Sequence, residues 1–450
     1  MVLTTLIFLL LVGINFSPFL RGPADWPPEW RWSYYFVNTL DKVWLPLVII
    51  LLILWLFYVL EKKKIKLDSW VSLVLLVSLA YVFQLSVLYF SRHGIFVLIH
   101  RVINPDLNGY YTEAVKIKNL TEFIINYQKN VLDFSMHATG HPPGGIIFFW
   151  LIEKIISIVP LLKNIAYNLT PSHTDVKLIW NNLTLVQRLT AIVSAFFIPL
   201  LGSLNLIPLF YLAKKLFDKI TALRSVVLAA FIPALTLFTP LNDVFFPLFF
   251  LWSFLFLIKG IKEKKPWLAF YSGIIFSVGL FFTLTILPLI VIYFFYLLAN
   301  KKLVFPFLFG LFIFHFSLFT LGYNVLTVSY TLMTGLPKGR LYLTWVFYNL
   351  YDFFIFTGLP VALTYLSMFT KRIKELLFIS FTFVLFLLNF SGAVRGEVGR
   401  IWLPLMFPVI MIVGNYLTNK LKVSTKYFLF LLFLQAVQVL VLQEFWVTLW

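Results

Sequence analysis

The sequence contains no cysteine among its 450 residues. Disulfide bonds, thiolate metal sites and a cysteine nucleophile are therefore excluded. Charged residues are also scarce, at 12% of the chain, whereas hydrophobic residues make up 61%. Because a soluble domain carries about a quarter charged residues, this balance excludes an ordinary soluble fold.

Long apolar runs fill most of the chain instead, and the mean hydropathy is +0.93. A helix needs ~20 apolar residues to cross ~30 Å of hydrocarbon. Backbone polar groups cannot stay unpaired in lipid, so runs without alternation indicate helices. The sequence therefore predicts an all-α polytopic membrane protein with about thirteen transmembrane helices. The predicted spans are 2–20, 43–60, 70–90, 188–213, 220–240, 243–259, 267–282, 284–299, 303–322, 352–370, 375–390, 401–418 and 427–446.

Two features of these spans leave alternatives open. The first run lacks a basic segment before it and a small-residue cleavage site, so we expect a retained helix rather than a signal peptide. The runs 267–282 and 284–299 are either two spans or one long one. The apolar run 146–162 is interrupted by Glu153 and Lys154. We therefore expect it to lie along the outer surface.

The 36 basic residues exceed the 18 acidic ones, which gives a net charge of +18. Basic residues cluster in short tracts between apolar runs, which is the positive-inside pattern of cytoplasmic loops. This placement predicts contact with anionic membrane lipids and argues against nucleic acid as a partner. The tracts are 62–64, 214–215, 259–265, 301–302, 371–374 and 420–426.

With these tracts inside, four loops face outside, and the chain divides into three parts. Residues 1–66 form an N-terminal transmembrane hairpin with an aromatic outer loop. Residues 67–300 form a core whose outer loop, 91–187, contains short helices. Residues 301–450 are C-terminal helices with outer loops at 323–350 and 390–400. The aromatic residues expected to form an interfacial belt are Trp26, Trp30, Trp32, Tyr34 and Tyr35.

The first large outer loop carries the first candidate for chemistry, Asp106. It follows Asn104-Pro105 and precedes Gly109, which together predict a turn. We expect a carboxylate partly shielded from water, with a raised pKa, that acts as a general base. The alternative is an aspartate that caps a helix beginning at Tyr110.

Two histidines, His137 and His141, lie further along the same loop. Their spacing could ligate a metal ion only on a helix, and Gly140 and the prolines 142–143 argue against a helix. We expect His141 to make a fixed polar contact and the prolines to begin the next helix, whose N-terminus would favour an anion. The alternative is a rigid turn with surface histidines. The two histidines therefore predict no metal site, and the sequence leaves open whether the protein uses a divalent ion as a cofactor.

Asp243 and Asn242 lie at the outer joint of two spans. An ionisable group at that depth is a candidate site residue, while a helix N-cap is the alternative. On the last outer turn, Arg395 and Arg400 flank Glu397 and suit a bidentate grip on a phosphate. The alternative is a structural clasp between an arginine and Glu397. Weaker phosphate-binding candidates on the preceding outer loop are Lys338 and Arg340.

The motifs resemble the GT-C superfamily of integral membrane glycosyltransferases. Asp106 after an early span, Tyr110-Tyr-x-Glu113, and His141-Pro-Pro at the head of an apolar helix are similar to the branch of protein O-mannosyltransferases and the lipid A aminoarabinose transferase. Residues 187–217 are similar to the span that follows, and Asp243 falls where related enzymes carry an acid. The resemblance covers 70–300.

The chain departs from that branch in three places. Leu107 stands where an acidic pair would have Glu, so Asp106 works alone or Glu113 supplies the second carboxylate. The hairpin 1–60 precedes the usual first span. The turn from Arg395 to Arg400 is not part of the family signature.

The resemblance implies a GT-C-like bundle and an inverting hexosyl- or pentosyltransferase of the cell envelope. A sugar would move from a polyprenyl-phosphate donor to a glycan, lipid or protein acceptor on the extracytoplasmic face. Asp106 and Glu113 would be catalytic. The predicted substrate-binding residues are Tyr110, His137, His141, Asp243, Lys338, Arg340, Arg395, Glu397 and Arg400.

Two other classes of function remain. A transporter or flippase for a lipid-linked glycan predicts ionisable residues midway along the spans. Apart from Glu153, Lys154 and His315, the apolar runs contain few such residues. A scaffold subunit of an envelope complex would not need an acidic outer site. The polar loop therefore favours an enzyme that works at one membrane face.

Overall fold

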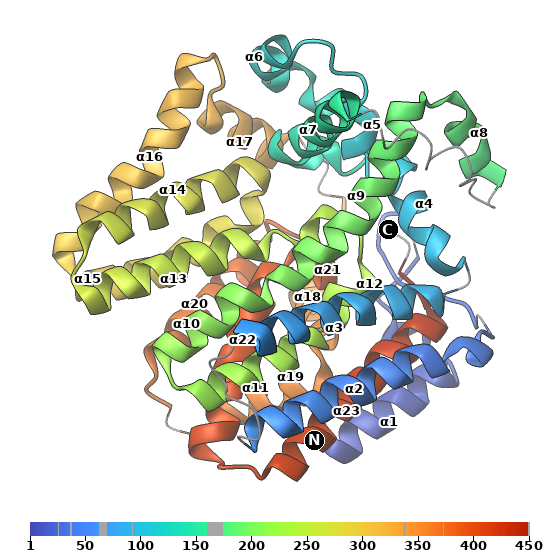
Figure 1. Cartoon of the computed structure of the whole chain (residues 1–450), viewed down its shortest axis with the longest axis vertical. Coiled ribbons are helices and arrows are strands. Elements are labelled where there is room, and N and C mark those ends of the chain that lie inside the picture. Colours follow the sequence, from blue (N-terminus) through green and yellow to red (C-terminus); the bar gives the residue numbers. More distant parts are fainter. Residues whose placement is uncertain are drawn as a thin grey trace.

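The computed structural model describes residues 1–25, 27–36, 38–62, 70–91, 93–159, 174–335, 339–371 and 373–448. In these ranges the regular structure is helical except for one short ribbon (Figure 1). The ribbon pairs β1 (Ser33–Tyr34) with β2 (Trp446–Val447) in antiparallel fashion, which joins the two ends of the chain. The prediction of an all-α polytopic membrane protein is confirmed.

Six helical segments in the described ranges are long and apolar enough to cross a membrane. Seven further candidates are one bent pair of helices and six shorter apolar helices, so the number of thirteen spans stays a prediction. The six long segments are Leu40–Glu61, Trp70–Tyr89, Leu185–Leu216, Asn242–Glu263, Lys301–Thr320 and Thr425–Phe445.

The centre of the bundle is α22, in which every residue is buried. It packs against α11, α13, α19 and α20, and α1 and α2 pack on α23 at the periphery (Figure 1). The helices of this part are α1 (Val2–Gly13), α2 (Trp44–Glu61), α3 (Trp70–Tyr89), α9 (Leu185–Leu204), α10 (Leu206–Leu216), α11 (Lys219–Ala230), α12 (Pro233–Leu237), α18 (Tyr342–Thr357), α19 (Leu359–Ser367), α20 (Leu376–Ser391), α21 (Val398–Ile401), α22 (Leu403–Asn415) and α23 (Thr425–Phe445).

The predicted outer loop 91–187 contains short helices, as expected. Helices α5, α6 and α7 lie at the top of Figure 1 and α4 and α8 at its right, and α5 packs on α7 while α7 packs on α9. The helix predicted over 146–162 is α7 and begins directly after Pro143. These helices are α4 (Val97–Ile103), α5 (Tyr110–Ala114), α6 (Leu120–Asn130), α7 (Gly144–Ile158) and α8 (Thr174–Asn182).

A second group of helices projects from the bundle, at the left of Figure 1. Its helices α14 and α16 touch backbone to backbone, because a Cβ at Gly273 or Gly310 would overlap the facing main chain. Small residues permit such close contact between membrane helices. The group comprises α13 (Pro247–Glu263), α14 (Pro266–Phe282), α15 (Ile290–Leu298), α16 (Val304–Thr320) and α17 (Val325–Thr334).

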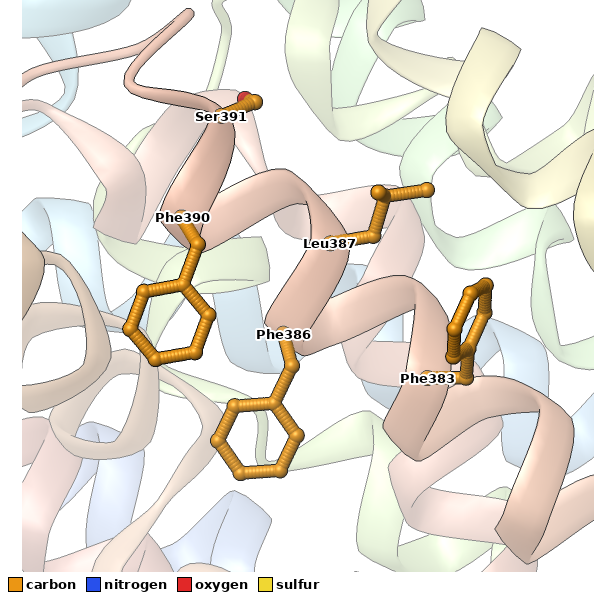
Figure 2. Close-up of a pocket in the computed structure, with 5 residues that line it drawn as sticks. All are labelled: Phe383, Phe386, Leu387, Phe390 and Ser391. Atoms are coloured by element: carbon orange, nitrogen blue, oxygen red, sulfur yellow. The ribbon is translucent and has the colours of Figure 1, made fainter.

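Apolar side chains on the outside of the bundle mark its lipid-facing surface. On α20 they line an open groove of about 420 Å³, formed largely by phenylalanine rings (Figure 2). A soluble protein rarely exposes contiguous apolar surface of this kind. An exposed apolar surface of this kind suits a helix that contacts the acyl chains of lipids. The groove residues are Phe383, Phe386, Leu387, Phe390 and Ser391.

Three predicted boundaries were wrong. The first span ends at Gly13 rather than at residue 20, because Asn15 adopts a positive φ of 49° and Pro18 follows. The helix predicted to begin at 352 is α18, which begins at Tyr342 within the predicted outer loop 323–350. It ends at Thr357, and at the next residue, Gly358, φ is 109° and the chain bends by 118° into α19.

The sequence left open whether residues 267–299 form one long helix or two. The structure has two separate helices there. Helix α14 ends at Phe282, and the Thr283 hydroxyl accepts a hydrogen bond from the Thr285 amide at 3.2 Å. A 3-10 helix (Leu284–Leu289) then leads into α15.

The prediction of an interfacial aromatic belt near residue 30 is wrong for Trp30 and Trp32. Trp30 is 4% exposed and Trp32 is 3% exposed, so both belong to the core. Their rings meet edge to face at 5.4 Å. Tyr35 does lie at the surface, and Trp26 lies outside the described residues.

Candidate functional site

A buried polar cluster forms where the outer loop meets two turns of the bundle. Arg400 lies at its centre, with its guanidinium 3.5 Å from Asp243 Oδ2 and 3.0 Å from Glu397 Oε2. The same guanidinium is 3.3 Å from His137 Nδ1. The side chains of Arg400 and Asp243 are 5% and 3% exposed. Three segments distant in the sequence therefore share one ion-pair network.

The carboxylates determine the charge state of Arg400. Burial alone would lower the pKa of the guanidinium, but Asp243 and Glu397 outweigh burial and raise it. A buried cation between two carboxylates is stable only while both partners remain. Arg400 is therefore charged at every physiological pH.

Glu397 connects this centre to two further arginines. Its Oε1 lies 3.0 Å from an Arg340 nitrogen. Arg340 and Arg395 also exchange hydrogen bonds, each donating to the other's backbone carbonyl at 2.6 and 2.7 Å. The clasp that the sequence left as an alternative is present, with Glu397 between Arg340 and Arg400. Lys338 lies outside the described residues.

Tyr110, His141 and Asn242 complete the cluster. The rings of Tyr110 and His141 meet edge to face with centroids 5.5 Å apart. A Cβ at Gly145 would lie 2.8 Å from both the Asn242 amide nitrogen and the Tyr110 ring, so only glycine fits at this contact. Neither Asn242 nor Asp243 caps a helix, which excludes the capping alternative.

Several polar atoms of this cluster are buried without a hydrogen-bond partner among the described residues. Buried polar atoms in folded proteins are nearly always satisfied, so a concentration of unsatisfied ones is unusual for a structural core. The arrangement is typical of a site that receives a polar ligand. The atoms are Tyr110 Oη, His137 Nε2, His141 Nδ1, both amide atoms of Asn242, and Asp243 Oδ1.

The two histidines are neutral. Burial, with the nearby Arg400 charge, lowers the pKa of His141 to about 3 and the pKa of His137 well below 6.5. Each residue keeps part of its surface accessible, although its unpartnered ring nitrogen is buried. A neutral imidazole has one donor and one acceptor nitrogen, so each ring can bind a hydroxyl without adding charge.

The neutral histidines predict a pH dependence of stability. As the pH falls from 6.5 toward 3, the unfolded chain binds protons at His141 that the folded protein does not bind, so the free energy of unfolding falls. The loss is up to about 1.4 kcal/mol per pH unit and histidine. His141→Asn should make thermal stability in detergent less dependent on pH between 6.5 and 4.5. If His141→Asn and the parent protein showed the same pH dependence of stability, His141 would be protonated in the folded protein over this pH range.

Glu113, predicted as a second catalytic carboxylate, holds the outer loop together. Its Oε1 accepts hydrogen bonds from the Ser135 amide at 3.0 Å and from the Ser135 hydroxyl at 2.5 Å. Lys116 lies 2.9 Å from both carboxylate oxygens. Burial raises the pKa of Glu113, but the Ser135 and Lys116 contacts outweigh burial, and the pKa lies below its ordinary value. The carboxylate thus joins α5 to the segment that carries His137.

This clamp also predicts a pH dependence. Because the pKa of Glu113 is lowered on folding, its stabilisation is complete above 4.5 and is lost as the pH falls through the folded value. The protection of the Ser135 amide, which is its exchange rate compared with the intrinsic rate at the same pH, should therefore fall in acid, and Glu113→Gln should show low protection at every pH. The matched control is Glu122→Gln, since Glu122 is exposed on the same loop. Equal effects of both variants would contradict the clamp.

Asp106 lies on an exposed turn beside the cluster. Its amide donates to Asn104 Oδ1 at 2.9 Å, and Gly109, not Asp106, occupies the N-cap of α5. The expected shielding from water is wrong, because Asn104 closes the turn and leaves the Asp106 side chain outside. A Cβ at Gly109 would overlap the Met136 carbonyl, so this turn packs directly on the segment that leads to His137.

The structure thus brings most of the predicted site residues together. Arg340 and Arg395 adjoin the cluster through Glu397, Glu113 supports the outer loop, and Asp106 is exposed beside it. In the described part of the chain, no group of three or more metal-ligating side chains is close enough to hold a metal ion. The predicted residues in the cluster itself are Tyr110, His137, His141, Asp243, Glu397 and Arg400.

Two buried acids near the cluster, Asp352 and Glu29, were not predicted from the sequence. Asp352 lies in an otherwise apolar stretch of α18, and Glu29 accepts hydrogen bonds from the Trp345 indole at 2.6 Å and the Leu341 amide at 3.0 Å. An isolated acid in an apolar run is a functional candidate by default. The same criterion that selected Asp243 would have selected Asp352.

Residues 178–323 match the family model described as dolichyl-phosphate-mannose-protein mannosyltransferase. The matched region runs from α8 to the end of α16 and contains the turn with Asp243. A comparison with curated proteins finds no significant match. The predicted resemblance to the GT-C superfamily is confirmed over the matched residues, and it supports a membrane glycosyltransferase similar to mannosyltransferases.

Proposed function

We propose that the protein transfers a sugar from a polyprenyl-phosphate donor to an acceptor at the extracytoplasmic face of the membrane. One observation carries this proposal: six buried polar atoms on five neighbouring side chains have no partner among the described residues. They include neutral donors and acceptors as well as one carboxylate oxygen. A sugar, with hydroxyls that both donate and accept, is the ligand class that satisfies such a set.

The arginines next to this cluster suit the leaving group. Transfer leaves a phosphate with the electron pair of the broken bond to the anomeric carbon, so stabilising that charge is the main electrostatic task. Arg340 and Arg395 are only partly buried and lie beside the cluster. We assign them to the donor phosphate, together with Lys338 on the adjoining segment. Arg400, enclosed by Asp243 and Glu397, orients the polar side chains that would bind the sugar.

Asp106 is the proposed general base. Its exposed carboxylate can be reached by an acceptor from the aqueous side, whereas the donor enters from the lipid. Asp106 takes the proton of the acceptor hydroxyl while the hydroxyl oxygen forms its bond to the anomeric carbon. Attack opposite the departing phosphate inverts the configuration. Glu113 has both oxygens bound by Ser135 and Lys116, so we assign it a positioning role.

The arrangement of charges supports an outward-facing site. Basic tracts at the ends of α10 and α13 meet through Lys215 and Glu263, 3.4 Å apart. The outer-loop helices above the cluster lie at the other end of these spans (Figure 1). Because basic tracts mark the cytoplasmic side, the cluster faces the opposite side.

The test is a direct transfer assay. Protein in lipid nanodiscs is incubated with radiolabelled polyprenyl-phosphate mannose and an extract of envelope lipids, glycans and proteins as acceptors. We expect label to leave the donor fraction while free polyprenyl phosphate accumulates in equal amount. Nanodiscs without protein give the background. The proposal is rejected if the donor is neither bound nor consumed and the protein in reconstituted vesicles moves lipid-linked glycan between leaflets. That result would identify a transporter.

A further inference from the structure

The turn that carries Arg400 is attached to the N-terminal segment through Asp352. Asp352 Oδ2 accepts a hydrogen bond from the Gly399 amide at 2.7 Å, directly before Arg400. Its other oxygen, Oδ1, accepts a hydrogen bond from the Trp32 indole at 3.0 Å. Asp352 is 8% exposed. Both oxygens of a buried carboxylate therefore connect a tryptophan near the start of the chain to the backbone of the site.

The same tryptophan contacts the turn that carries Asp243. The Trp32 ring lies 5.5 Å from the ring of Phe238, shortly before Asp243, and 5.1 Å from the ring of Phe356. Phe356 packs so closely against Gly399 that a Cβ there would overlap it. Trp32 thus contacts Phe238, on the segment that leads to Asp243, and Phe356, which packs against the residue before Arg400.

The C-terminus closes this arrangement from the other side. Arg101, 2% exposed, donates to the carbonyls of Leu237 at 2.7 Å, Thr239, and Thr448 at 2.9 Å. Thr448 directly follows β2, which pairs with β1 next to Trp32. Arg101 therefore links the turn before Asp243 by hydrogen bonds to the residue that follows β2, and β2 pairs with β1 in the N-terminal segment.

We propose that Trp32 and Asp352 form a brace that sets the position of Arg400 relative to Asp243, and that the backbone pairing of β1 with β2 holds the segment of Trp32 in place. Trp32 and Asp352 are then positioning residues for the sugar transfer, which rests on the function proposed above. Both lie outside the region 178–323 that matches the mannosyltransferase family. The chain ends thus contribute to the site without contacting substrate. Small displacements of catalytic geometry have large kinetic effects, up to about a hundredfold for 1 Å.

Trp32→Phe tests the brace because it keeps an aromatic ring and removes the indole donor to Asp352, and the control below removes the same ring volume without removing a hydrogen bond between described residues. We expect kcat to fall about tenfold or more while KM for the donor changes less than about twofold. The matched control is Trp446→Phe. Trp446 is equally buried, packs on Phe356 at 6.2 Å, and its indole nitrogen has no partner among the described residues. This control should retain kcat within about twofold.

A double-mutant cycle separates the hydrogen bond from general packing. Asp352→Asn alone should lower kcat as Trp32→Phe does. Because Trp32 reaches the Gly399 amide only through the Asp352 carboxylate, the double variant should be little worse than Asp352→Asn alone. Fully additive losses would show that the two residues act independently, which overturns the brace.

A second measurement does not depend on catalysis. Since the sequence contains no cysteine, a spin-label pair at Met136→Cys and Ala393→Cys is unambiguous; both positions are exposed. Their distance reports how the Arg395–Arg400 turn docks on the outer loop. We expect one narrow distance distribution in the parent protein, a broadened or shifted one with Trp32→Phe, and the parent distribution with Trp446→Phe.

The outcomes distinguish the two proposals. A distribution that broadens with Trp32→Phe in a protein that never transfers sugar would retain the brace and reject the function. An active enzyme whose kcat and label distance are both unchanged by Trp32→Phe would retain the function and reject the brace. Equal changes from Trp32→Phe and Trp446→Phe would also reject it, because the effect would then come from packing of the aromatic cluster.

Discussion

Asp106→Asn is expected to lower the rate of sugar transfer by at least about a hundredfold, the lower end of what a general base contributes. The substitution keeps the size of the side chain and removes its ability to take a proton from the acceptor. Because Asp106 is exposed and its turn is closed through Asn104, expression and melting temperature should stay unchanged. Initial rates with saturating donor and acceptor measure the effect.

The matched control for this prediction is Asp133→Asn. Asp133 is another exposed aspartate of the same outer loop, and it has no assigned role in the reaction. It should retain the parent rate. A fully active Asp106→Asn variant would reject Asp106 as the base and leave Asp243, the carboxylate inside the cluster, as the next candidate.

Arg400→Met is expected to abolish transfer and to lower the free energy of unfolding by about 3–5 kcal/mol. Methionine fills much of the volume, but Asp243 keeps a buried charge without its partner, and Glu397 loses one of its two arginines. Removing one member of a buried charge network is costly for that reason. Denaturant or thermal unfolding in detergent, followed by tryptophan fluorescence, measures the loss.

Lys215→Met is the comparison, since it breaks an ion pair that is accessible to water. Lys215 and Glu263 are 39% and 34% exposed. Water screens such a pair, so its loss should cost much less than the loss of the Arg400 network. If Arg400→Met cost no more than Lys215→Met, the Arg400 network would not be the buried centre described above.

The cluster shows how far local sequence rules reach. Asp243 was selected because an acid is rare at the joint of two spans, and His141 because Gly140 and two prolines interrupt the chain there. These criteria are local, and the structure places both residues in the cluster. That Arg400 joins them could not be predicted, because the segments lie far apart in the sequence and nothing local specifies which turn packs on which.

The errors have an equally physical cause. A tryptophan near the end of an apolar run has the same local sequence whether it lies at the lipid interface or in the core, so Trp32 was assigned to a belt although it is 3% exposed. Asp106 was expected to be shielded because a turn was predicted at the membrane rim. Which side of a turn faces water depends on the neighbouring loop rather than on the turn itself.

The amino-acid sequence alone determined that this is a helical membrane protein whose polar side chains gather in the loops between apolar runs. Hydrocarbon accepts only apolar helices whose backbone is internally bonded, so composition and run length suffice for that conclusion. The tertiary structure alone decided that Arg400 pairs with Asp243 and that the two chain ends support them. Burying a charge is tolerated only beside a partner, and the packing of distant helices selects that partner.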